Sequence, residues 1–187
     1  MRYEYSTTTE ALRSERPTVL AESPDLNRTG KAVVWLSNIR VYSFGLMFSV
    51  SVLTRELDVD LVLGEPDFAH QPDTTASVLF GIEFADGRTV ALDRPAPDRV
   101  LMEVRDSFSG AGSLQASVLL VPIPPSGPRR FVTAIPRLDV SEAVVTLDGD
   151  HIAAVSEQVE RLWTGTQAPN GLGGAGLRGG GWFNRLD

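Results

Sequence analysis

The chain has 187 residues, enough for one domain with a sizeable core, and its 42% hydrophobic and 22% charged residues are typical of a globular protein. Its formal net charge of −7 disfavours non-specific binding to nucleic acid, because an acidic surface repels phosphate groups. The absence of cysteine excludes disulfides, thiol catalysis and cysteine-ligated metal sites.

The N-terminal 30 residues are polar, with a threonine run at positions 7–9 and prolines at Pro17 and Pro24. We expect a polar N-terminal arm over residues 1–30 that stays irregular unless it docks on another surface. These residues lack the apolar segment of a signal peptide, and no apolar run in the chain reaches the roughly 20 residues that cross a bilayer. We therefore expect a cytoplasmic protein that does not bind membranes.

Residues 31–164 show the pattern of a β-rich domain. Along 44–53, apolar residues alternate with Ser49 and Ser51, which is the period of two expected for a strand with one buried face. The apolar face of this strand would consist of Leu46, Phe48, Val50 and Val52. Segments rich in β-branched and aromatic residues predict seven more strands, at 32–41, 78–84, 89–92, 100–104, 114–122, 130–135 and 143–147.

Two connections between these strands carry clear turn signals. Asp86-Gly87 stands between two β-rich runs and predicts a hairpin with a two-residue type I′ turn. Residues 122–128 contain four prolines, which cannot donate to a sheet ladder, so this segment predicts a rigid connection between strands.

A helix is predicted over residues 150–163, after the acidic Asp148 and Asp150 that favour a helix N-terminus. Its apolar face would consist of Ile152, Val155, Val159, Leu162 and Trp163. We expect this helix to pack across a sheet edge or a barrel mouth. The predicted fold is mainly β: a single β-sandwich or flattened barrel of about seven or eight strands, with one C-terminal α-helix and extended termini.

The acidic residues between Arg55 and Arg88 are the main candidates for chemistry. Four of them could meet at a cation site or form a pair of catalytic carboxylates, namely Asp58, Asp60, Glu65 and Asp67. The stretch contains no Asp-x-Asp-x-Asp-Gly ligand loop, so a solvated acidic surface is the simpler interpretation. We expect no resident metal, no cofactor and no assignable catalytic residue.

Residues 165–187 form a glycine-rich tail that contains 8 of the 17 glycines. A chain of this composition behaves as a flexible tether. Near its end stand four residues that suit binding to a partner: Trp182, Phe183, Arg185 and Leu186. The aromatic pair either docks on a partner or sister subunit, which we favour, or folds back onto its own domain.

The proline-rich connection at residues 120–128, Phe131, Pro136 and the predicted helix ending Leu162-Trp163 carry a resemblance. Over about residues 31–164 the chain resembles a group of uncharacterised actinobacterial proteins that share a proline-rich strand connection and a C-terminal helix ending Leu-Trp. The resemblance implies a similar strand order and a genome of high GC content, and it implies no activity and no functional residue.

Three functions remain open at this point. The leading hypothesis is a non-enzymatic protein-binding or structural module whose tail docks on a protein partner or on a second copy in a homo-oligomer. A carboxylate-based hydrolase or lyase would need an invaginated acidic pocket built from the four carboxylates. A small-ligand carrier would need an apolar cavity inside the β domain.

Overall fold

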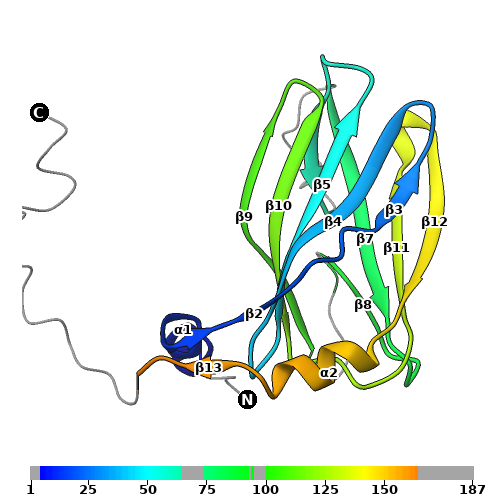
Figure 1. Cartoon of the computed structure of the whole chain (residues 1–187). Helices are drawn as coiled ribbons and strands as arrows, with labels where there is room; N and C mark the ends of the chain where they lie inside the picture. The colour runs from blue at the N-terminus through cyan, green and yellow to red at the C-terminus, as the bar shows by residue number, and fades with distance from the viewer. Residues whose placement is uncertain (1–4, 65–73, 93, 95–99, 164–187) are drawn as a thin grey trace, which may run out of the picture.

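Two β-sheets packed face to face form the body of the protein (Figure 1). The computed structural model describes residues 5–64, 74–92, 94 and 100–163. The first sheet has the order β2-β4-β5-β10-β9, with β3 also paired to β4, and the second has the order β12-β11-β7-β6, with β8 also paired to β7. In the described part of the chain the two sheets share no backbone ladder, so the predicted β-sandwich is confirmed.

The first sheet and its flanking segments are formed by α1 (Tyr5–Ser14), β1 (Glu15–Arg16), β2 (Thr18–Leu20), β3 (Asp25–Arg28), β4 (Ala32–Val41), β5 (Leu46–Thr54), β9 (Leu101–Gly110) and β10 (Ser113–Val121). The second sheet and its flanking segments are formed by β6 (Asp60–Leu63), β7 (Thr75–Glu83), β8 (Thr89–Ala91), β11 (Arg129–Ile135), the short 3₁₀ helix Pro136–Leu138, β12 (Val140–Leu147), α2 (Asp150–Ser156) and β13 (Glu160–Arg161). Among these described elements, neither α-helix is long and apolar enough to cross a bilayer.

The core lies between the sheets and follows the alternation seen in the sequence. The alternating apolar residues of β5 are at most 2% exposed: Leu46, Phe48, Val50 and Val52. An aromatic cluster joins the two sheets, because Phe48 of β5 lies 5.8 Å from Phe80 of β7 and 6.4 Å from Phe131 of β11, measured between ring centroids. Ser49 and Ser51, expected to face solvent, are buried as well. Ser51 pairs with Trp35 on one side and with Gln115 on the other. These larger side chains on the neighbouring strands cover the small serine and keep it from solvent.

The N-terminal segment is part of the folded body, and the prediction of an arm over residues 1–30 is wrong for its described part. β2 and β3 both pair with β4, and Leu20 and Leu26 are buried in the core. The structure therefore has more strands than the seven or eight expected. The unpredicted strands are all short: β1, β2, β3, β6 and β13.

The type I′ turn predicted for one hairpin is found in another. At the β7–β8 hairpin the Gly87 amide donates to the Phe84 carbonyl and only Gly87 has positive φ, at +81°, so the predicted hairpin is present but not as a two-residue type I′ turn. At the β9–β10 hairpin Ala111 and Gly112 have φ of 49° and 69°, which is the backbone pattern of a type I′ turn.

Helix α2 lies across one end of the sandwich, as expected, with Ile152 and Val155 buried (Figure 1). It ends at Ser156 rather than at residue 163. β13 instead pairs with β1, and the Leu162 amide donates to the Ser14 carbonyl. The two segments at opposite ends of the described chain are thus joined, and the protein has a second helix, α1, that the sequence did not predict.

Candidate functional site

Arg129, the first residue of β11, extends into the interior of the sandwich. On this strand Phe131, Thr133 and Ile135 face the core and the intervening residues face outward, so the side chain of Arg129 is on the inner face. Only 1% of the residue is exposed. Because burying a charge is costly without hydrogen-bond partners, the contacts of this guanidinium define the site.

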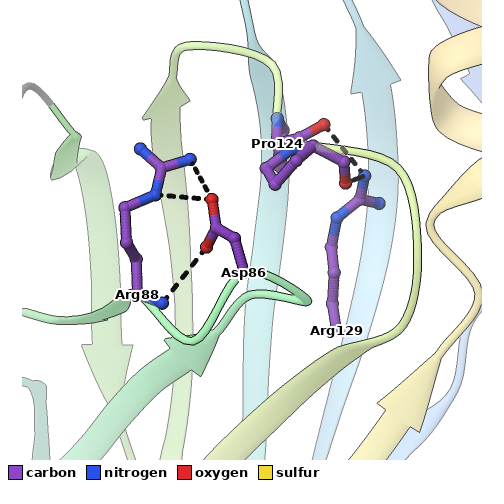
Figure 2. A network of polar contacts seen from close by, with 5 residues as sticks. Asp86, Arg88, Pro124 and Arg129 are labelled. Atoms are coloured by element: carbon purple, nitrogen blue, oxygen red, sulfur yellow. Dashed lines mark hydrogen bonds and ion pairs between the residues drawn. The ribbon is translucent and has the colours of Figure 1, made fainter.

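One nitrogen of the guanidinium is fully used. Nη2 donates to the carbonyl oxygens of Pro124 at 3.3 Å, Pro125 at 3.2 Å and Gly149 at 3.2 Å. Figure 2 shows Arg129 reaching the carbonyls of the proline-rich connection. The connection itself is tied to the start of α2, because the Gly127 amide donates to Asp150 Oδ1 at 2.7 Å.

The other two nitrogens, Nε and Nη1, are buried and have no hydrogen-bond partner among the described residues. No carboxylate in this part of the chain forms an ion pair with Arg129. Burial lowers the pKa of Arg129, and the more distant charges of Asp148 and Asp150 oppose that shift. The positively charged guanidinium of Arg129 therefore has N–H groups, on Nε and Nη1, that donate to no described acceptor.

Asp86 does not supply the missing acceptor. Its carboxylate is turned toward Arg88, whose Nε and Nη2 both lie 2.7 Å from Oδ2 (Figure 2). The backbone and side-chain hydrogen bonds from Arg88 lower the pKa of Asp86, so this carboxylate stays ionised within its own hairpin.

Arg129 lies in the wall of a pocket of about 510 Å³ at the end of the sandwich where α2 is located. The inner walls are apolar and come from both sheets and the helix: Leu36, Leu46, Phe48, Phe131, Leu147 and Ile152. The rim carries the exposed polar side chains of Glu22, Ser23, Asp148 and His151. The result is an apolar pocket with one buried cationic group, which is the usual composition of a small-molecule site.

Comparison with protein-family models, curated proteins and solved structures finds no match to this chain. We therefore infer the function from the geometry of the pocket and from the placement of the residues singled out in the sequence.

The acidic candidates do not line this pocket. Asp58 and Asp60 are both exposed on the surface next to β6, and Glu65 and Asp67 lie outside the described residues. Within residues 5–64, 74–92, 94 and 100–163, no group of three or more acidic or histidine side chains is placed to hold a metal ion. The exposure of Asp58 and Asp60 counts against a catalytic carboxylate pair built on them.

The predicted partner-binding residues Trp182, Phe183, Arg185 and Leu186 also lie outside the described residues. The described chain ends at Trp163, whose side chain is 62% exposed and donates from Nε1 to the Arg13 carbonyl at 3.0 Å. The last described residue therefore lies next to the N-terminal helix α1.

Sequence reasoning did not single out Arg129, although two signals point to it. It directly precedes the predicted strand 130–135 and has the same parity as Phe131 and Ile135, which places it on the buried face if the strand begins one residue earlier. It also directly follows a proline-rich segment, whose carbonyls lack ladder partners and need a donor from elsewhere.

Proposed function

We propose that this chain is a non-enzymatic binding module that holds a small molecule in the pocket beside Arg129. The observation that carries the proposal is the buried guanidinium, whose Nε and Nη1 have no partner in the described structure and which lies in an apolar pocket. A buried donor without an acceptor costs about 1–3 kcal/mol, and a ligand that brings an acceptor recovers that energy. The pocket volume lies within the range of natural small-molecule sites.

Filling the pocket tests this proposal. Leu147 lies directly opposite Arg129 in the β11–β12 register and packs against the core. In Leu147→Trp the indole should occupy the pocket and weaken binding of Nile red, a neutral apolar dye, at least tenfold. The measurement is a fluorescence titration of the dye, with circular dichroism to show that each variant is folded.

The matched control is Val144→Trp, on the outer face of the same strand, where the residue is 41% exposed. This variant should bind the dye as the wild type does. If the wild type does not bind Nile red, or if Leu147→Trp binds it unchanged, the pocket is not a binding site and the proposal is wrong.

The sequence hypothesis of a docking tail is favoured by a separate observation. β1 and β13 pair, and Leu162 and Trp163 remain 41% and 62% exposed where the tail begins. The C-terminal end of the described chain thus presents two exposed apolar side chains beside the N-terminal segment, which suits a surface between subunits or partners. We propose, as a second function, that residues 165–187 dock on a partner or on a second copy of the chain.

Truncation after Thr164 tests the docking tail. The full chain is expected to form a larger assembly than the truncated one, or the truncated chain is expected to bind a synthetic peptide of residues 165–187 at the exposed Trp163. Sedimentation velocity measures the assembly, and the fluorescence anisotropy of a dye-labelled 165–187 peptide measures its binding to the truncated chain. Identical sedimentation with no anisotropy change would contradict the docking role and would leave the pocket proposal unaffected.

A further inference from the structure

The geometry around Arg129 points to a definite class of ligand: we infer that the pocket takes a monocarboxylate with an apolar body, whose carboxylate accepts hydrogen bonds from the unpaired guanidinium nitrogens while its hydrocarbon lies against the core. This inference rests on the proposed function and deepens it. Its basis is the placement of one buried, partly unpaired cation in the wall of a pocket whose buried lining is otherwise apolar.

The charge of Arg129 favours a carboxylate over a neutral acceptor. The guanidinium stays protonated in proteins, and it meets only neutral carbonyls, at Pro124, Pro125 and Gly149. Hydrogen bonds between charged groups are roughly twice as strong as neutral ones. Since no described carboxylate touches this cation, an anionic ligand head would both accept the free N–H groups and neutralise the buried charge.

The surroundings of the pocket argue for a single negative charge. Asp148 and Asp150 lie near enough to Arg129 to act on its pKa, and Glu22 stands at the rim. Both aspartates already accept backbone hydrogen bonds, Asp148 from the Asp150 amide and Asp150 from the Gly127 amide. A phosphate dianion would bring two negative charges to one cation and would be repelled by these acids, whereas a carboxylate monoanion matches the single charge of Arg129.

The inner walls set the body of the ligand. Leu36, Leu46, Phe48 and Phe131 are each at most 5% exposed overall, and all four contribute to the pocket surface. Apart from Arg129, the polar side chains that line the pocket belong to exposed residues, namely Glu22, Ser23, Thr146, Asp148 and His151, so the buried walls favour a hydrocarbon body over a sugar or a nucleoside. An aliphatic or aromatic chain gains free energy by leaving water, and a medium-length acid fits the volume.

The test compares two ligands that differ only in the head group, octanoate and 1-octanol, on the wild-type chain. Octanol is the more apolar molecule, so a pocket that recognises only hydrocarbon should prefer it. We expect octanoate to bind at least tenfold more tightly, measured by displacement of Nile red. We also expect the Arg129 Nε–H resonance to shift on addition of octanoate and not on addition of octanol.

Arg130 is the internal control in the same spectra, because it faces outward on β11 and pairs with Glu83 at 2.7 Å. Its Nε–H resonance should not move. Equal affinity for the two compounds, or an unmoved Arg129 resonance, would overturn the carboxylate inference while Nile red binding still supports the pocket. If neither compound nor Nile red binds, the proposed function fails together with the inference.

Discussion

Replacement of Arg129 by methionine is expected to lower the free energy of unfolding by about 2–4 kcal/mol, since it removes the donor from two buried carbonyls and one partly buried carbonyl. Those carbonyls belong to Pro124, Pro125 and Gly149. Methionine has a similar length and removes the cost of a buried charge, which offsets part of the loss. Equilibrium unfolding in urea measures the change.

The control for this variant is Arg130→Met, one residue further along β11. Arg130 is exposed and forms a surface ion pair with Glu83, a type of contact that contributes at most about 1 kcal/mol. A loss confined to Arg129→Met would show that the guanidinium supports the end of the sandwich. Equal stability of the two variants would mean that the three carbonyl contacts contribute nothing net, and the structural account of Arg129 would be wrong.

The packing of Arg129 at the end of the sandwich also requires a glycine at position 149. A Cβ at Gly149 would stand 2.8 Å from Arg129 Cζ and would collide with the Gly127 carbonyl oxygen. The guanidinium, the proline-rich connection and the start of α2 are therefore packed as one unit. This unit fixes the position of the two unpaired nitrogens, because Nη2 is held by carbonyls from two different segments.

The long strands and the sandwich could be predicted because their signal is local. Each of the eight predicted strands corresponds to a strand of the structure, and the alternation along β5 identifies its buried face. The other five strands, each of two to four residues, could not be predicted this way. β2 spans three residues, Thr18–Leu20, and is a strand because β4 offers an edge to pair with, which is a property of the fold rather than of the segment.

The end of α2 shows how a periodic pattern extends too far. Val159, Leu162 and Trp163 continue the helical spacing of Ile152 and Val155, yet the helix ends at Ser156. Pairing of β13 with β1 competes for the same residues, and only Ile152 and Val155 reach the core. The spacing of apolar residues in 150–163 contains no information about β1. The pairing of β13 with β1 could therefore not be predicted from this segment.

The pocket was beyond local reasoning for a related reason. Its walls come from five separate parts of the chain, and the sequence indicates each part without indicating that they meet. The acidic residues were candidates because a run of charges of one sign can be recognised in the sequence alone. A single arginine on the buried face of a strand is less conspicuous, although its burial makes it chemically more informative.

Replacement of Gly112 by alanine is expected to destabilise the protein by about 3–5 kcal/mol, for reasons of backbone geometry alone. Gly112 has φ of 69° in the β9–β10 turn, where an L side chain costs roughly 1–2 kcal/mol. A Cβ there would also collide with the Glu56 carbonyl oxygen and lie 2.5 Å from Thr54 Oγ1. Relieving these contacts moves the Gly112 carbonyl, whose oxygen accepts hydrogen bonds from the Thr54 amide at 2.8 Å and from Thr54 Oγ1–H at 2.9 Å.

Gly110 provides the matched control, two residues earlier in the same hairpin. A Cβ at Gly110 meets no atom within 4 Å, and its φ is not positive, so Gly110→Ala should change stability by less than about 1 kcal/mol. Urea unfolding of the two variants separates the effect of the turn from that of removing any glycine. If the two variants had the same free energy of unfolding, Gly112 could not lie against Thr54 and Glu56 as described. The contact between this turn and the end of β5 would then be wrong.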